Sequence, residues 1–273
     1  MTWQEPFELA LRGGDPLAAS DALRKERREG RIRRAEHEAA ARIVERLAPS
    51  SLVRRDWAAR LLAHPRRVDK ELAASLLLPL VATHPSDVER AIQRLAVDDD
   101  WEVREWAASL LGRALGRAWE HFAPRALAWS RQGPSRLRRA VVVAAKYAGR
   151  ARVRGRGDAL LDLLEPAVGD HDEYLRRSLG PFAVGDGLLR AYPGETLARL
   201  EAWAARSEPD ARWNAAMAFS TASAAAHADR ARPLLRALAD DPEPFVRRAA
   251  ATALRRLGAR VLEIAASAPA GAV

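Results

Sequence analysis

The sequence Arg55-Asp56-Trp57-Ala58-Ala59-Arg60-Leu61-Leu62 returns 49 residues later, nearly unchanged, as Arg104-Glu105-Trp106-Ala107-Ala108-Ser109-Leu110-Leu111. So close a match is hard to obtain by chance. Self-similarity at a period of about 35 to 50 residues is typical of stacked helix pairs, none of which can bury its apolar face alone. The pattern therefore predicts a chain built from helical repeats.

A second set of repeats is marked by an apolar residue followed by arginine. Its arginines are Arg104, Arg138, Arg176, Arg212 and Arg247, which lie 34, 38, 36 and 35 residues apart. An apolar anchor stands nine residues before four of them, in the order Leu95, Trp129, Trp203 and Leu238. We predict that the first helix of each pair ends at this anchor and that the second begins at the arginine.

The composition agrees with helices throughout. Ala, Leu, Arg and Glu dominate, and β-branched residues never cluster in the alternation that a strand needs. Apolar positions three and four residues apart are interrupted by short Pro, Gly or Asp clusters. We predict an all-α fold, a right-handed α-solenoid of about six or seven stacked antiparallel helix pairs. The acidic turn and apolar-Arg helix at residues 240–250 resemble HEAT-type, armadillo-like repeats.

Three stretches depart from the repeat pattern. Residues 1–49 are highly charged and are interpreted as N-terminal capping helices, and residues 265–273 are interpreted as a disordered tail. The solenoid is predicted to span residues 50–264, between them. The segment 180–187 carries three glycines and a proline, which predicts a broken helix. The break is either a plain inter-helix loop or a device that shapes a site on the inner face.

The charge balance indicates an anionic partner. Of the 273 residues, 45 are Lys or Arg and 36 are Asp or Glu, so the net charge is +9. Lysine occurs only as Lys25, Lys70 and Lys146, which leaves 42 arginines. Arginine presents a planar fork of donors that suits phosphate. Composition bias and solvated Arg/Glu pairs account for most of these arginines.

The sequence lacks the residues that several classes of chemistry require. Cysteine is absent, the six histidines show no metal-binding spacing, and neither a phosphate-binding Gly-Lys loop nor a Gly-x-Ser-x-Gly motif occurs. We therefore expect no metal and no cofactor. Neither a long apolar run nor a secretory pattern at residues 1–12 is present, so we expect a cytoplasmic monomer without membrane contact.

Eight of the 16 aromatic residues are tryptophan. Trp57, Trp106, Trp129 and Trp203 are expected to fill the gaps between repeats. Trp101 and Trp213 stand beside charged residues at the starts of second helices and are the better functional candidates. An indole beside a carboxylate suits a cationic alkylated nucleobase, which leaves without protonation once a carboxylate stabilises the sugar oxocarbenium.

The segments 170–179, 192–197 and 200–203 resemble a known protein family. Their order, an acidic turn, Tyr-Leu-Arg-Arg-Ser, a Pro-Gly-Glu and then Leu-x-x-Trp, resembles bacterial HEAT-like-repeat DNA alkylation repair proteins. That family includes DNA glycosylases that excise alkylated purines. The resemblance implies DNA binding and hydrolysis of the N-glycosidic bond of alkylated bases, with Glu105 at the position of one family acid and Asp186 near another. The acid expected after Arg139 is replaced by Ala140 and a run of valines.

The leading hypothesis is a solenoid whose inner face binds duplex DNA, alkylated or not, through phosphates. The candidate catalytic residues are Glu105 and Asp186, and the candidate DNA contacts are Arg104, Arg138, Arg139, Arg176, Arg177, Arg212, Arg247, Arg248, Trp101 and Trp213. As an alternative reading, one arginine of each doublet pairs with a preceding acidic residue such as Asp172 or Glu243. A rival function is a non-catalytic scaffold that binds proteins or peptides.

Overall fold

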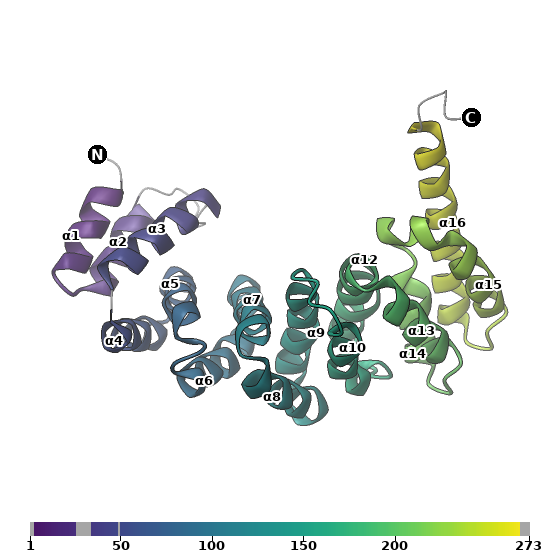
Figure 1. Cartoon of the computed structure of the whole chain (residues 1–273), viewed down its shortest axis with the longest axis horizontal. Coiled ribbons are helices and arrows are strands. Elements are labelled where there is room, and N and C mark those ends of the chain that lie inside the picture. Colours follow the sequence, from purple (N-terminus) through teal and green to yellow (C-terminus); the bar gives the residue numbers. More distant parts are fainter. Residues whose placement is uncertain (1–2, 26–33, 49, 268–273) are drawn as a thin grey trace. The chain divides into compact units, whose positions relative to one another are not determined.

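The computed structural model describes residues 3–25, 34–48 and 50–267 (Figure 1). In these ranges every regular element is a helix, so the predicted all-α fold is confirmed. The chain forms two compact units, unit 1 (Met1–Phe122) and unit 2 (Ala123–Val273), and the division falls inside α8 (Trp119–Gln132).

Unit 1 contains two helical hairpins preceded by three further helices. Its elements are α1 (Gln4–Arg12), α2 (Pro16–Lys25), α3 (Arg34–Leu47), α4 (Ser51–Ala63), α5 (Arg67–Leu77), the 3-10 turn η1 (Leu78–Leu80), α6 (Pro85–Ala96) and α7 (Trp101–Arg117). α4 packs on α5, α6 packs on α7, and the second helices α5 and α7 contact each other.

The N-terminal helices pack on the first hairpin. α1 packs on α2, α2 contacts α4 and α5, and α3 contacts α1 and α5. They bury Phe7, Leu11, Leu23 and Val44 and leave their charged faces in solvent. These helices belong to the same compact unit as α4 and α5. The boundary at residue 49 between capping helices and solenoid stays a prediction. Parts of the predicted capping region, residues 1–2, 26–33 and 49, lie outside the described residues.

Unit 2 continues the pairs in two layers. After the remainder of α8 come α9 (Ser135–Gly149), α10 (Gly157–Leu164), η2 (Glu165–Ala167), α11 (Glu173–Arg177), η3 (Ser178–Leu188), α12 (Leu189–Ala191), α13 (Pro193–Ala204), α14 (Pro209–Ala218), η4 (Ala222–His227), α15 (Ala228–Ala239) and α16 (Pro244–Ser267). The second-helix layer is α9, α11–η3–α12, α14 and α16, each in contact with the next, and α10, α13 and α15 form the first-helix layer.

The predicted repeat register is confirmed. The repeating arginines lie at the starts of α7, α9, α11, α14 and α16, all of them second helices. The anchors Leu95, Trp129, Trp203 and Leu238 lie in first helices and are buried, with at most 8% of each residue exposed. Counted along the chain from α4 to α16, the described helices form six pairs, within the predicted range.

The near-identical octapeptides do not occupy equivalent positions. The first lies in α4, the first helix of its pair, and the second lies in α7, the second helix of the next pair. Trp57 is buried in the core, whereas Trp106 is partly exposed and donates its indole N–H to Glu71 Oε1 at 3.0 Å. Both helices of a pair are amphipathic and rich in the same residues, so a short match cannot tell a first helix from a second.

The predicted break at 180–187 is wrong, because the helix continues through it as the π-helix η3. A Cβ on Gly180 would lie 2.7 Å from the carbonyl oxygen of Asn214, and one on Gly185 would lie 2.3 Å from that of Ala218. Here glycine brings η3 against α14, and this close packing offsets its low helix propensity. The helix α16 also runs to Ser267, three residues into the predicted tail, and residues 268–273 lie outside the described part.

Candidate nucleic-acid interface

Three of the repeating arginines of unit 2, which we call the first arginines, join neighbouring repeats. Arg138 pairs with Asp170, and Arg176 Nη1 lies 2.5 Å from Asp210 Oδ1. Arg212 forms a fork on Asp241, with Nε to Oδ2 at 2.6 Å and Nη2 to Oδ1 at 3.0 Å. Each aspartate lies at or just before the start of the next second helix, so these ion pairs hold adjacent repeats in register.

Three of the five repeating arginines, Arg104, Arg212 and Arg247, close the turn that precedes their own helix. Arg104 Nη1 donates to the carbonyl oxygens of Asp98 and Asp99, both at 2.7 Å. Arg212 Nη1 donates to the carbonyls of residues 206 and 207, and Arg247 Nη1 to those of residues 241 and 242, at 2.7 to 2.9 Å. These carbonyls follow the end of a first helix and need a donor, which the guanidinium supplies.

The acidic partner of each first arginine lies in the next repeat. The expected partner Asp172 instead caps α11 through the N–H groups of Tyr174 and Leu175 and accepts the hydroxyl of Ser135. The Ser135 hydrogen bond holds the pKa of Asp172 below its ordinary value. The acidic turn that neutralises a first arginine is therefore that of the next repeat and not the one before it.

The second arginine of each doublet is partly exposed, as for Arg139, or exposed, as for Arg177 and Arg248. Arg139 Nε donates to Ser178 Oγ at 3.1 Å, and its guanidinium carbon lies 5.1 Å above the ring of Tyr174. Arg177 contacts Glu173 in a surface pair, and Arg248 is exposed. The side chain of Arg177 is 72% exposed, whereas those of the first arginines Arg138, Arg176 and Arg212 are 22%, 22% and 12% exposed. We call Arg139, Arg177 and Arg248 the second-arginine row.

The candidate tryptophans differ in environment. Trp213 occupies the position of the second arginine in α14, is partly exposed, and stacks under Arg176 with 4.9 Å between the guanidinium carbon and the ring centroid. Trp101, at the start of α7 in unit 1, is 59% exposed. Trp213 therefore shares a surface with the second-arginine row, whereas Trp101 belongs to the other unit.

The two candidate carboxylates also belong to different units. Glu105 lies in α7 and is partly exposed. Asp186 lies in η3 of unit 2 and accepts Lys146 Nζ and Arg190 Nη2, both at 2.7 Å. Lys146 is itself buried against the ring of Phe182, with Nζ 3.4 Å from the centroid. Two cations thus offset the charge of Asp186, which leaves little of it to stabilise a cationic sugar.

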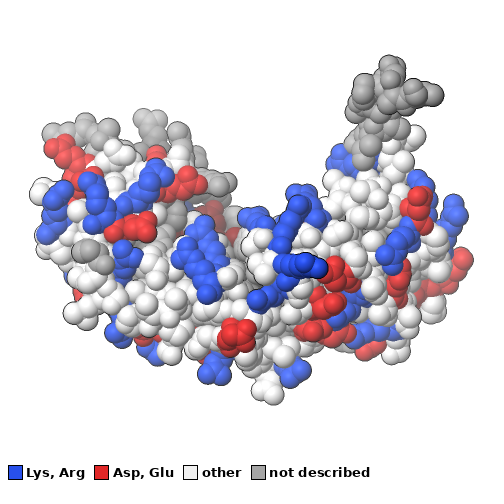
Figure 2. Space-filling view, in the orientation of Figure 1, with Lys and Arg blue, Asp and Glu red and all other residues white. Residues whose placement is uncertain are grey.

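Sequence reasoning missed an arginine-rich connection between α9 and α10. Residues 150–156 read Arg-Ala-Arg-Val-Arg-Gly-Arg, with arginine at every second position, and we call this segment the arginine loop. Arg150, Arg152 and Arg154 are exposed. Figure 2 shows Lys and Arg side chains gathered over the part of unit 2 where α9 meets α10. Four arginines without an intervening acid were the signal available in the sequence.

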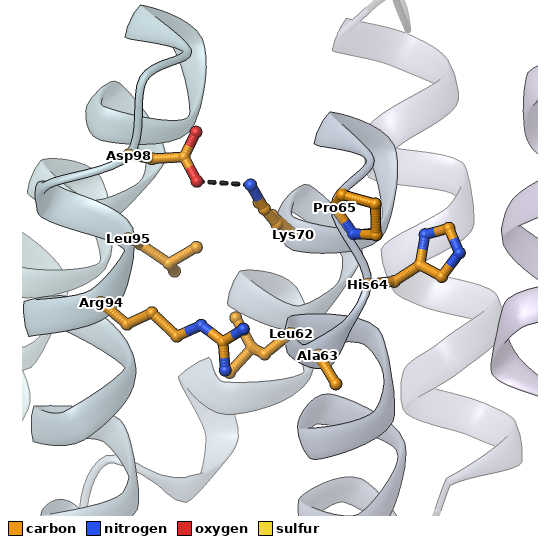
Figure 3. A pocket seen from close by; sticks show the side chains of 8 residues that line it. All are labelled: Leu62, Ala63, His64, Pro65, Lys70, Arg94, Leu95 and Asp98. Carbon is orange, nitrogen blue, oxygen red and sulfur yellow. Dashed lines mark hydrogen bonds and ion pairs between the residues drawn. The ribbon is translucent and has the colours of Figure 1, made fainter.

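A hollow of about 270 Å³ lies in unit 1 between the turn after α4 and the end of α6 (Figure 3). Lys70 pairs with Asp98 at its edge, and Arg94 extends from α6 toward Leu62. His64 Nδ1 lies 2.6 Å from Asp69 Oδ2, but the nearby hydroxyl of Ser20 donates to Asp69 rather than to the histidine. No nucleophile is therefore paired with a base among the groups of this cluster.

Within residues 3–25, 34–48 and 50–267, no three His, Asp or Glu side chains converge as metal ligands. None of the helices in that part of the chain combines the length and apolar character that crossing a bilayer requires.

Residues 231–261, from α15 into α16, match the HEAT repeat family model. The chain contains a HEAT repeat. Within this HEAT repeat lie Asp241, which receives the fork of Arg212, and Arg247, which closes the turn after α15. The matched repeat therefore supplies the acceptor of the ion pair that joins it to the preceding repeat. A search of curated proteins gives no match to the chain.

Proposed function

We propose that this HEAT-repeat protein binds the phosphate backbone of duplex DNA through the second-helix layer of unit 2. The supporting observation is the division of the arginines: Arg138, Arg176 and Arg212 pair with an aspartate of the next repeat, whereas the second-arginine row is partly or fully exposed. Guanidinium groups at one repeat position of α9, α11 and α16, with the indole of Trp213 at that position in α14, suit a polymer of regularly spaced phosphates.

The local contacts of the row favour such a role. Stacking on Tyr174 holds the Arg139 guanidinium in place, which lowers the entropy lost when a phosphate binds. Arg177 is paired only with Glu173, one helical turn earlier on an exposed face. Such a surface pair stabilises a protein by less than about 1 kcal/mol, so a phosphate can replace Glu173 at small cost.

Binding is tested by fluorescence anisotropy of a labelled duplex between 50 and 200 mM KCl. If the row contacts phosphates, log K falls linearly with log salt, by about 0.9 per contact. Replacement of Arg139, Arg177 and Arg248 by glutamine should weaken binding. It should also reduce the magnitude of this slope by up to about 2.7, which is about 0.9 for each of three lost contacts. Absent or salt-insensitive binding of the wild-type protein would refute the proposal.

The resemblance to alkylation repair proteins extends the proposal to alkylated DNA as a ligand but not to base excision. Since Asp186 is paired with both Lys146 and Arg190, we expect no free N3- or N7-alkylpurine above the blank when the protein binds methylated duplex. Release of base that is lost in Asp186→Asn and in Glu105→Gln would instead establish a glycosylase.

A protein or peptide partner is the second candidate, and the exposed aromatic surface favours it. Tyr174 is 38% exposed and Trp213 is partly exposed, and aromatic residues of this kind are typical hot spots of protein interfaces. Tyr174→Ala separates the two candidates. A DNA-binding surface would keep most of its affinity and its salt slope, whereas a peptide-binding surface would be severely weakened and show little salt dependence.

A further inference from the structure

We infer that the arginine loop between α9 and α10 is a second phosphate-binding element, which holds the strand opposite to the one bound by the second-arginine row. This inference rests on the proposed function. Nothing in the repeat pattern requires the loop, because its arginines lie outside the apolar-Arg motif that orders the repeats.

The backbone of the loop is defined by its own hydrogen bonds. Arg152, with φ +48°, ends the helical path after α9 and donates its N–H to the carbonyl of Gly149 at 3.0 Å. Gly155, with φ +74°, sits at the third position of a turn closed by the N–H of Arg156 and the carbonyl of Val153 at 3.1 Å. Only glycine adopts that φ without strain, so the turn is specified locally.

The loop is also fastened to the next repeat. The hydroxyl of Tyr192 donates to the carbonyl of Val153 at 3.2 Å, and Arg152 Nη2 lies 3.4 Å from the carbonyl of Arg190. The exposed guanidinium groups are therefore carried on an anchored backbone. Such an arrangement lowers the entropy lost on binding a polyanion.

Arginine at position 152 has a conformational cost. A left-handed residue that follows a helix is usually glycine, because any Cβ raises the energy of this conformation. The sequence nevertheless has arginine there, between the arginines at 150 and 154. Strain of this kind persists at functional sites, where the side chain contributes more than the backbone loses.

The charges around the loop leave a positive excess. The nearby cations are Lys146, Arg150, Arg152, Arg154, Arg156 and Arg190, and the nearby carboxylates are Asp158, Asp186 and Glu195. Asp186 is engaged by Lys146 and Arg190, and Asp158 faces Arg199 at 3.9 Å. The three exposed arginines of the loop thus dominate this edge of unit 2.

The geometry of α9 relates the loop to the row. Arg139 and the C-cap residue Arg150 are 11 residues apart, about three helical turns, so they lie on one side of the helix. At 1.5 Å per residue, Arg139 and Arg150 are about 16 Å apart along the axis. The major groove of B-DNA is about 12 Å wide between its bordering backbones. Two rows of cations at this separation can contact both strands that border one major groove.

The experiment compares three charge-matched variants of the full chain with the wild type. The loop variant replaces Arg150, Arg152 and Arg154 by glutamine, and the row variant replaces Arg139, Arg177 and Arg248. The control replaces Arg230, Arg232 and Arg236 on α15, which lies in the first-helix layer. Circular dichroism and urea unfolding establish that each variant is folded. Anisotropy then gives the affinity and the salt slope for a duplex and for a single strand of equal length.

We expect the loop variant to reduce the duplex salt slope by up to about 2.7, three contacts' worth, beyond any change in the control. Its loss of affinity should be larger on the duplex than on the single strand. A loop variant equal to the control, with the row variant impaired, overturns the inference and leaves the proposed function standing. Equal losses on duplex and single strand refute the opposite-strand placement. If the wild-type protein binds no DNA, both the proposed function and the inference about the arginine loop are overturned. If the row variant binds like the control while the loop variant is impaired, only the proposed role of the second-arginine row is refuted.

Discussion

The two ends of the second helices in unit 2 use arginine differently. At the N-terminal ends, Arg138, Arg176 and Arg212 each face an aspartate of the next repeat. At the C-terminal end of α9, the exposed Arg150, Arg152 and Arg154 belong to a group of six cations that outnumber the three carboxylates nearby. The first set holds the solenoid together and the second set is available to a ligand, so the net charge of +9 is a poor guide to where an anion binds.

The largest effect is expected where an arginine of the N-terminal end is removed. Arg212→Met leaves the carboxylate of Asp241, whose side chain is 4% exposed, without its fork and frees two turn carbonyls. An unpaired buried charge costs about 3 to 5 kcal/mol, so the urea midpoint should fall steeply. Arg248→Met is the matched control and should change the free energy of unfolding by less than about 0.5 kcal/mol. Equal effects of the two variants would contradict the division between first and second arginines.

The same contact has a pH signature. Burial raises the pKa of Asp241, but the hydrogen bonds from Arg212 and from the backbone N–H of Glu243 outweigh it, and the net pKa is lowered. A carboxylate whose folded pKa is depressed stabilises the fold above its unfolded value and loses that contribution as the pH falls. Unfolding free energy should therefore decline below about pH 4, and less so in Arg212→Met.

A buried carboxylate of unit 1 has the opposite dependence. Burial raises the pKa of Glu71 to about 7, against the hydrogen bond from Trp106 and the charge of Arg67. Because the folded pKa exceeds the unfolded one, the contribution of Glu71 to stability is lost as the pH rises from about 4.5 to 7. Glu71→Gln keeps an acceptor for Trp106 and should stabilise the protein by up to about 3 kcal/mol at pH 8 and little at pH 4.5. Thermal unfolding at both values checks this, and an equal shift at the two pH values would refute it.

The π-helix η3, which connects α11 to α12, packs closely on α14 through its glycines. Gly185→Ala places a methyl group against the carbonyl of Ala218 and the side chain of Thr221, and it should destabilise the fold by about 1 to 3 kcal/mol. In Gly194→Ala the added Cβ meets no neighbouring atom, so the better helix propensity should stabilise by up to about 1 kcal/mol. Unfolding in urea compares the two, and a neutral Gly185→Ala would contradict the close packing of η3 on α14.

The repeat register could be predicted because it depends on local features. An acidic turn, an apolar residue and an arginine recur near the start of each second helix, and burial of Leu95, Trp129, Trp203 and Leu238 confirms the anchors. In α5 the equivalent fourth position holds Lys70, which pairs with Asp98 just before α7, so no arginine marked that pair in the sequence. The near-identical octapeptides misled for the opposite reason, since similar composition placed them in different helices of a pair.

The candidate site was harder to predict because it depends on contacts between repeats. Arg138 and Arg139 are alike in the sequence, and only the aspartate 32 residues beyond Arg138 separates a stacking arginine from a surface one. Asp186 likewise looked available until Lys146, 40 residues earlier, was found against it. The glycines of η3 could not be interpreted without knowing how closely α14 approaches. The repeat register can be predicted from short segments of sequence. Whether a charged side chain is free to bind a ligand depends on its neighbours in the folded structure.

The smallest effect is expected at Arg152, where stability and binding should change in opposite directions. With φ at +48°, Arg152→Gly removes the cost of a left-handed arginine, and we expect a gain of about 0.5 to 1 kcal/mol in unfolding free energy. The same change removes one guanidinium from the arginine loop, so the salt slope for duplex DNA should fall by about 0.9. Arg154→Gly is the matched control, because it removes the same charge where φ is negative and should lose about as much stability as Arg152→Gly gains. If Arg152→Gly stabilises the protein without weakening binding, the strained arginine has no role in holding DNA, and the C-terminal end of α9 differs from the N-terminal end only in lacking acids.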